Sequence, residues 1–212
     1  MTYEFSIKNF DELTSVDLYH SLKARSQVFV VEQNCVYQDM DEVDFDCLHL
    51  IAHQNQALAG YCRIIPPEFN TLKSNLSSSM STDAPAIKTS TTAMPAIGRV
   101  LVLAEHRGDG LARQIMTQAI AHCRKRYGKK TPIIISAQTY LLGFYESLGF
   151  VPEGDRYLEE NIEHVKMVLY VAKKTKVKKE RVDAPTATTK ILGSLLFIMA
   201  ALFILGLLYL MI

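Results

Sequence analysis

A short stretch with two glycines lies between an apolar run and a long amphipathic segment, and its residue types suit a phosphate group. It reads Arg107-Gly108-Asp109-Gly110-Leu111-Ala112, with Arg113 following. Glycine permits unusual backbone angles and lets backbone amides approach a ligand closely. The first amides of the helix that follows are unpaired and carry a partial positive charge, which suits a diphosphate. The stretch therefore predicts a diphosphate-binding loop, although two glycines before a helix are also typical of a simple turn.

Two better-known nucleotide motifs are excluded. A P-loop carries Lys and then Ser or Thr after its glycines, and the full dinucleotide fingerprint has three glycines; neither pattern is present here. Arg107 and Arg113 can add positive charge beside the amides. The loop alone therefore indicates a bound anion and does not identify the molecule that carries it.

Hydrophobic periodicity predicts the elements that must position this loop. Ile97–Leu103 is an apolar run typical of a buried strand, and Pro132–Ala137 is another. Between them, apolar residues recur every four positions over 111–123, as on the buried face of a helix. Leu141–Leu148 is predicted as a short helix that Gly149 ends. Strands that alternate with helices in this way indicate a mixed central α/β sheet flanked by helices.

Similar patterns predict the remaining elements. They are a short strand over residues 3–7, a helix over Val16–Glu32, a hairpin of Cys47–Gln54 and Ala57–Ile65 around Asn55-Gln56, and last strands at Phe150–Val151 and Val165–Val171. Together they form one domain over residues 1–172.

Residues 66–95 interrupt this domain. They contain LSSSMSTDAP and KTSTTAMP, which are dense in Ser and Thr and lack apolar periodicity. Such composition predicts a disordered or surface insertion. The strands on either side can still be neighbours, because loop-closure entropy grows only slowly with length.

Charge and cysteine content exclude some classes of protein. Lys and Arg number 23 against 22 Asp and Glu, so no overall basic field indicates nucleic-acid binding. The four cysteines lie far apart, without a CxxC pair or a histidine at zinc-finger spacing, so no metal site is expected. They are interpreted as free thiols in a reducing compartment. Cys35, in a predicted loop, is the candidate for a reactive thiol.

An uncharged apolar segment occupies residues 191–212. As a helix at roughly 1.5 Å per residue it would reach about 33 Å, enough to cross the hydrocarbon core of a bilayer. Seven of the Lys and Arg residues lie at 173–190, directly before it. Because positive flanks stay on the cytoplasmic side, we expect a single-pass tail anchor at 191–212, a basic juxtamembrane linker at 173–190 and a cytoplasmic domain. The basic linker can also attract anionic lipid headgroups.

Further ordered matches accompany the loop and extend over roughly residues 3–171 outside the insertion. They are Arg25, Val28-Phe29-Val30-Val31-Glu32-Gln33-Asn34-Cys35, Tyr37-Gln38-Asp39, His49, Arg63-Ile64, Ile97-Gly98-Arg99-Val100, Ala137-Gln138, Phe144-Tyr145, Gly149-Phe150, Tyr157, Glu159-Glu160 and His164. This pattern resembles the GNAT acyltransferase superfamily and, within it, the ElaA-like branch. It departs from the branch at Val36, where Pro is usual, and at Ala112, where many GNAT loops carry Gly.

The resemblance implies a GNAT fold and acetyl-CoA as cosubstrate. The residues implied to bind it are Leu101, Val102, Leu103, Arg107, Gly108, Asp109, Gly110, Leu111, Ala112 and Arg113. The loop would hold the pyrophosphate, the pantetheine arm would run along the strand, and a backbone amide at 101–103 would stabilise the oxyanion. An amine would attack the thioester directly. Tyr145 matches the superfamily tyrosine that protonates the departing thiolate, and it could also be a core aromatic residue.

The acceptor site is less defined. Matches to the ElaA-like pattern favour a lining of Glu32, Gln33, Tyr37 and His164. The general base stays open among Glu32, Asp39, His49, His164 and a chain of waters, whereas Glu105 beside the loop is more typical of a solvated residue. The acidic run over residues 39–46 could attract a cationic amine or be a solvated loop. The acceptor itself could be a small-molecule or a protein amine.

Two alternatives remain beside an acetyl-CoA-dependent N-acetyltransferase. Arg25, Val28-Phe29, Asp41, Asp44, His49 and Arg63 also resemble acyl-homoserine-lactone synthases, but those enzymes typically carry early tryptophans, and this chain has none. A catalytically degenerate, membrane-tethered binding module is the second alternative.

The family resemblance also implies which membrane the expected anchor would enter. This would be a bacterial inner membrane.

Overall fold

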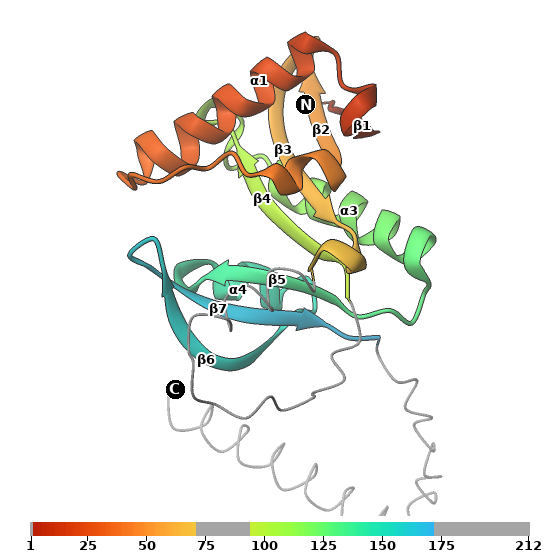
Figure 1. Cartoon of the computed structure of the whole chain (residues 1–212), viewed down its shortest axis with the longest axis vertical. Helices are drawn as coiled ribbons and strands as arrows, with labels where there is room; N and C mark the ends of the chain where they lie inside the picture. Colours follow the sequence, from red (N-terminus) through yellow and green to blue (C-terminus); the bar gives the residue numbers. More distant parts are fainter. Residues whose placement is uncertain (1, 71–93, 172–212) are drawn as a thin grey trace, which may run out of the picture. The chain divides into compact units, whose positions relative to one another are not determined.

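The computed structural model describes residues 2–70 and 94–171 (Figure 1). Within them, seven strands form one sheet in the order β1-β2-β3-β4-β5-β7-β6. The strands are β1 (Glu4–Asn9), β2 (Leu48–Gln54), β3 (Ala57–Ile65), β4 (Ala96–Val102), β5 (Ile133–Gln138), β6 (Val151–Glu159) and β7 (Ile162–Leu169). Neighbours are antiparallel except β4 and β5, which are parallel. The predicted mixed α/β sheet is confirmed.

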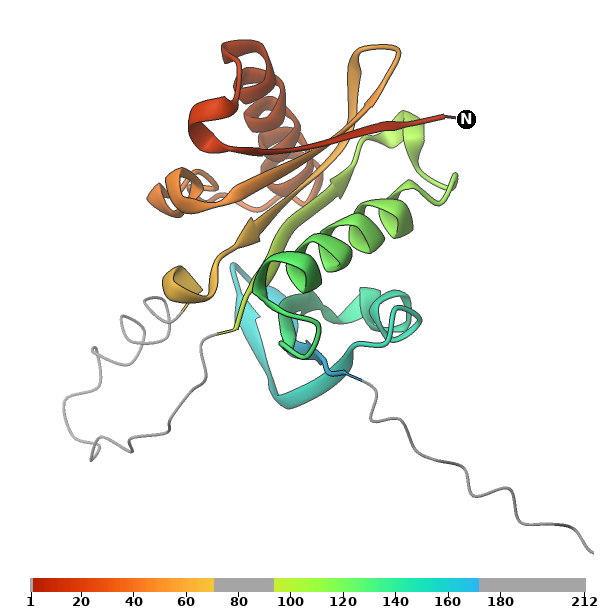
Figure 2. The same ribbon diagram turned by 90° about the vertical axis from the view of Figure 1, so that its right-hand side faces the viewer.

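Helices cover both faces of the first four strands. They are α1 (Ser15–Arg25), which continues as a π-helical segment over Ser26–Glu32, and α3 (Leu111–Tyr127). Figure 2 shows α3 across one face of the sheet, with α1 behind the other face. The core is divided accordingly: Ile115 of α3 packs in the cluster that contains Leu50, whereas Ala24 of α1 packs in the cluster that contains Ile51.

The sheet opens between β4 and β5. Their pairing is confined to Ala96 and Ile134, at the start of both strands, and beyond this point the strands diverge (Figure 1). Backbone groups of β4 that face β5 are therefore left without a ladder partner on that side. The opening divides the sheet into a β1–β4 part and a β5–β7–β6 part.

A β-bulge distorts β4 beside the opening. The register with β3 shifts between the Tyr61–Leu101 and Arg63–Gly98 pairs. Arg99 lies in this shifted stretch with a φ of 52°, which is unusual for a residue other than glycine. Bulges bend a strand and redirect its side chains, and here the bulge lies on the strand that borders the opening.

One turn and one helix end follow the sequence pattern closely. Asn55 and Gln56 both have positive φ, as the turn of a two-residue hairpin requires. The short helix α4 (Leu142–Glu146) is followed by Gly149 with a φ of 92°. The predicted last strands were wrong in extent, since β6 runs over Val151–Glu159. All of β6 is exposed to solvent, so its sequence lacks the apolar pattern that marks a buried strand.

The ends of the insertion lie together. Asn70 donates a side-chain hydrogen bond of 3.0 Å to the carbonyl oxygen of Met94, and Ile65 pairs with Ala96 where β3 and β4 adjoin. Residues 71–93, and the linker and anchor expected at 173–190 and 191–212, lie outside the described residues. In the part of the chain that the structure describes, no helix is long and apolar enough to cross a membrane.

Candidate functional site

A cavity of 1240 Å³ opens where β4 and β5 diverge. Four parts of the chain line it: the end of the π-helical segment with the loop after it, β3 and β4 where they meet the insertion, β5 with α4, and the β6–β7 hairpin. Phe29, Val43, Phe69, Ile134 and Ile162 give it apolar walls. A cavity of this size with a few polar groups is the usual form of a small-molecule site.

Strand pairing places three polar side chains in a row on the cavity side of the sheet. Gln138 of β5 pairs with His164 of β7, and His164 pairs with Tyr157 of β6. Residues directly opposite each other on neighbouring strands share a face, and all three line the cavity.

Side-chain hydrogen bonds fix this row. The amides of Gln33 and Gln138 exchange two bonds of 3.4 and 3.1 Å and so join the π-helical end to β5. The hydroxyls of Tyr157 and Ser136 lie 2.6 Å apart, and Ser136 donates to Glu159 at 3.0 Å. The polar side of the cavity is therefore held in place by contacts between elements.

Tyr145 borders the same cavity from α4. Its side chain is 7 % exposed and packs edge-on against Phe144 and Phe150. Burial raises the pKa of Tyr145 to about 12, so the phenol keeps its proton through the neutral and mildly alkaline range. No hydrogen bond joins its hydroxyl to another described residue, and the group is free to donate to a bound molecule.

The glycine loop lies at the start of α3. Gly108 and Gly110 have φ values of 90° and 77°, and Gly110 is the N-cap of the helix. An added Cβ at either position would meet no atom within 4 Å. The backbone conformation, rather than crowding, therefore requires glycine here. The first amides of α3, from Leu111 to Arg113, have no carbonyl within the helix to bond.

Both arginines of the loop already have partners. Arg107 donates to the Glu32 carboxylate at 2.6 Å and to the Val102 carbonyl oxygen at 2.9 Å. Arg113 donates to the Ser147 hydroxyl at 2.7 Å and lies over the Phe144 ring. Glu32 thus neutralises part of the positive charge that the sequence places beside the amides.

The end of β4 offers one amide to the opening. The Leu103 amide bonds the Ala59 carbonyl oxygen at 3.0 Å, so it points toward β3. Successive residues of a strand point their backbone groups to opposite sides. The Val102 amide therefore faces away from β3, toward the side on which the strands diverge.

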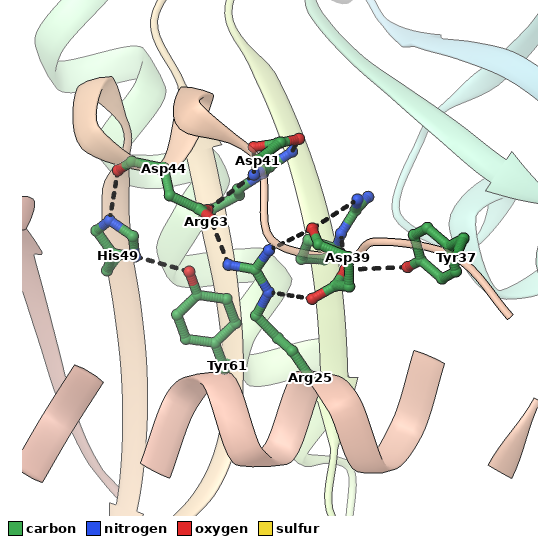
Figure 3. A network of polar contacts seen from close by, with 9 residues as sticks. Arg25, Tyr37, Asp39, Asp41, Asp44, His49, Tyr61 and Arg63 are labelled. Carbon is green, nitrogen blue, oxygen red and sulfur yellow. Dashed lines mark hydrogen bonds and ion pairs between the residues drawn. The ribbon is translucent and has the colours of Figure 1, made fainter. Parts of the chain in front are cut away.

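A buried ion network holds the loop that borders the cavity (Figure 3). Asp39 accepts from Arg25 at 2.7 Å and from Arg99 at 2.5 Å, and Asp44 accepts from Arg25 at 2.8 Å. Arg63 bonds Asp44 at 2.8 Å and Asp41 at 2.6 Å. Arg25 and Arg63 are each 1 % exposed. The acidic run is therefore not a solvated loop, because three of its carboxylates pair with three arginines.

His49 belongs to this network as well. Its Nδ1 lies 2.7 Å from the Tyr61 hydroxyl and its Nε2 lies 2.9 Å from the Asp44 carbonyl oxygen, so both ring nitrogens are engaged. Burial lowers the pKa of His49. Tyr37 in turn donates to Asp39 at 2.9 Å and lies close to Arg99, which fixes its ring at the edge of the cavity.

Comparison with known proteins assigns the chain to a family. Two models of the acetyltransferase (GNAT) domain match residues 24–117 and 84–171. A UPF0039 protein of Schizosaccharomyces pombe is 34% identical over 167 residues, which cover 78% of this chain and 96% of that protein. Protein ElaA of Escherichia coli is 32% identical over 77% of this chain and 94% of its own length. The chain belongs to the GNAT acetyltransferase family.

Solved structures agree with this assignment. The crystal structure of Escherichia coli ElaA superposes on this chain with a TM-score of 0.63 at 31% identity. The match covers 79% of this chain and 99% of ElaA. An acyl-CoA N-acyltransferase from Pseudomonas aeruginosa gives a TM-score of 0.64 at 32% identity, with the same coverage. Acyl-homoserine-lactone synthases share 12 to 18% identity at TM-scores near 0.6. That likeness shows the fold alone and does not favour the alternative enzyme class.

In the structure of this chain, three of the four expected acceptor residues line the cavity and one does not. Gln33, Tyr37 and His164 line the cavity, whereas Glu32 lies outside its lining and pairs with Arg107. The glycine loop and Leu101–Leu103 do not line the cavity either, although Val100 and Tyr145 do. The cavity therefore brings together three of the four expected acceptor residues, and the glycine loop lies beyond the end of β4.

The structure revises one expectation about a single residue and adds one feature that was not expected. Cys35 is buried and its thiol donates to the Glu160 carbonyl oxygen at 3.1 Å, so it is not an exposed reactive thiol. The arginine network was missed by sequence reasoning. Arg63 and Arg99 each interrupt an apolar run, and this signal could have predicted arginines buried against the acidic residues downstream of Arg25.

Proposed function

We propose that this protein transfers an acetyl group from acetyl-CoA to a primary amine by direct attack. GNAT membership supports acyltransfer from an acyl-CoA. The single observation that carries the mechanism is the divergence of β4 and β5, which opens the backbone edge of β4 between the glycine loop and the cavity. A pantetheine arm bound along this edge would direct the thioester from the loop toward Tyr145.

In the proposed reaction the amine nitrogen attacks the thioester carbonyl carbon and the carbon–sulfur bond breaks. The Val102 amide is suited to stabilise the oxyanion, because it faces the opening. Tyr145 gives its proton to the departing thiolate. Holding the amine and the thioester together supplies a further part of the rate acceleration.

Charge at the cavity supports a cationic acceptor. Four carboxylates contribute to its exposed rim: Glu42, Asp46, Glu159 and Glu160. The basic residues of the lining are already paired, Arg63 and Arg99 within the ion network and Lys166 with Glu153 at 2.6 Å. The unbalanced negative charge would attract a protonated amine.

An amine screen tests the proposal directly. The full chain is incubated with acetyl-CoA and with ethanolamine, phenethylamine, spermidine or Nα-acetyl-lysine methylamide, and the release of free CoA thiol is measured. We expect release that depends on the amine, with acetylated amine detected by mass spectrometry. No release above the acetyl-CoA blank with every amine would contradict the proposed activity.

A substitution in the glycine loop tests acetyl-CoA binding separately. Gly108→Ala places a Cβ on a residue whose φ is 90°, and relaxation of the loop would displace the amides. We expect acetyl-CoA to bind about tenfold more weakly by calorimetry, a loss of about 1.4 kcal/mol. Gly128→Ala is the matched control, because Gly128 has a φ of 105° at the far end of α3. Equal affinity in both variants would contradict the loop assignment.

We also propose that residues 191–212 anchor the protein in a membrane, with the catalytic domain on the cytoplasmic side. The support is the uncharged apolar sequence and the preceding Lys and Arg residues. The full chain should sediment with membranes and resist carbonate extraction, whereas a chain that ends at Lys190 should remain in the supernatant. Sedimentation of both forms would refute the anchor.

A further inference from the structure

His164 is a buried histidine at the cavity. It lies on β7 with 9 % exposure, and its ring stacks on Tyr157 with centroids 6.1 Å apart. Its Nδ1 lies 2.8 Å from the Ile162 carbonyl oxygen. Because a carbonyl oxygen only accepts hydrogen bonds, Nδ1 carries the hydrogen and Nε2 of the neutral ring keeps a lone pair. No hydrogen bond joins Nε2 to any residue that the structure describes.

The other candidates for a general base are engaged elsewhere. Glu32 pairs with Arg107 and lies outside the cavity lining. Asp39 is buried between Arg25 and Arg99. The ring nitrogens of His49 are both hydrogen-bonded in the network, and its side chain does not line the cavity.

The carboxylates at the rim of the cavity are exposed to solvent, whereas His164 is buried. Glu159 accepts from Ser136, and the residues Glu42, Asp46, Glu159 and Glu160 are all exposed to solvent. A general base accepts a proton most efficiently when it is held in position and its pKa lies near the working pH, and histidine is the side chain whose ordinary pKa lies there. His164 is oriented twice, by the Ile162 carbonyl oxygen and by the Tyr157 ring.

We infer that His164 is the general base that deprotonates the acceptor amine at Nε2. This inference rests on the proposed function. The ammonium nitrogen gives one proton to Nε2, its lone pair attacks the carbonyl carbon, and the carbon–sulfur bond breaks as Tyr145 protonates the sulfur. A second proton leaves the nitrogen as the amide forms. The first proton passes from His164 to solvent. The second proton restores the Tyr145 hydroxyl, whose own proton ends on the CoA thiol.

Two variants separate the base from the support that the ring gives. His164→Asn keeps a donor near the Nδ1 position for the Ile162 carbonyl oxygen and removes Nε2. His164→Gln places a non-basic amide near the Nε2 position. His20→Asn is the matched control, because His20 is exposed on α1 and does not line the cavity. All are full chains assayed with acetyl-CoA and whichever of the four named amines the wild type acetylates fastest.

We expect both His164 variants to lower kcat/KM for the amine by about 100-fold at pH 7, with acetyl-CoA affinity and melting temperature unchanged. As pH rises from 7 toward the amine pKa, this deficit should shrink by about tenfold per pH unit. The reason is that the variants depend on free amine that has already lost its proton in solution, and the fraction of free amine rises with pH. A merely structural role would give a deficit that does not change with pH.

Each result decides between specific claims. Wild-type turnover in both variants, a deficit that is constant with pH, or a loss explained by weaker acetyl-CoA binding would overturn the assignment of His164 while the proposed function stands. If the wild type acetylates none of the amines, the proposed function falls and the assignment falls with it. A loss of equal size in His20→Asn would also overturn it.

Discussion

Asp39→Ala should lower the free energy of unfolding by about 3–5 kcal/mol, the usual cost of removing one partner of a buried ion pair. Asp39 accepts from both Arg25 and Arg99, and Arg25 is almost completely buried. Without the carboxylate, the Arg25 charge keeps only part of its compensation, from Asp44. Urea denaturation followed by circular dichroism measures this loss.

Asp11→Ala is the control for this prediction. Asp11 is exposed and makes no ion pair with any described residue, so we expect a change within about 0.5 kcal/mol. A loss of less than 1 kcal/mol in Asp39→Ala would contradict a structural role for the network. The same variant should also free Tyr37, whose hydroxyl donates to Asp39.

The network also predicts how stability depends on pH. Burial tends to raise the pKa of Asp39, but Arg25 and Arg99 outweigh it and hold the pKa below its ordinary value. Folding therefore favours the charged form, and this contribution is complete above the unfolded pKa of about 3.9. It is lost as pH falls through the lower folded value. Asp39→Asn should therefore show a weaker loss of stability than the wild type below about pH 4.

Tyr145→Phe should lower kcat by about 100-fold, because the thiolate would leave without a positioned acid. The ring should keep its place, since Phe144, Phe150 and the surrounding core contact its carbon atoms. Acetyl-CoA affinity and the melting temperature should therefore stay close to the wild type. Steady-state assays of CoA release together with calorimetry measure both quantities.

Tyr140→Phe is the control for Tyr145. Tyr140 is an exposed tyrosine five residues earlier that does not itself line the cavity, and its hydroxyl donates to the Gln138 side chain. We expect Tyr140→Phe to retain turnover within a few-fold. Turnover at the wild-type level in Tyr145→Phe would remove the acid role. Equal losses of kcat and of acetyl-CoA affinity would assign Tyr145 to packing instead.

Elements that are determined by residues close together in the sequence could be predicted from it. The i, i+4 spacing of apolar residues gave α3, and the polar pair Asn55-Gln56 between two apolar runs gave the β2–β3 hairpin. Gly108 and Gly110 have the positive φ values that make glycine necessary at the start of a helix. Each of these signals depends on neighbours within a few residues, so a single sequence is sufficient to read it.

Features that depend on distant contacts could not be predicted in the same way. The fully exposed β6 has no apolar alternation, so only its pairing with β7 defines it. The pairing of Arg107 with Glu32 joins residues 75 positions apart. The inference that His164 rather than His49 is the general base depends on which histidine has a ring nitrogen without a hydrogen bond to a described residue. The sequence does not contain that information.

The crystal structure of the protein with acetyl-CoA tests the central claim most directly. We expect the diphosphate to accept hydrogen bonds from the backbone amides that follow Gly108, and the thioester carbonyl to lie against the Val102 amide. The sulfur should lie within about 3.5 Å of the Tyr145 hydroxyl. A diphosphate bound away from this loop, or a thioester that does not reach the opening between β4 and β5, would contradict it.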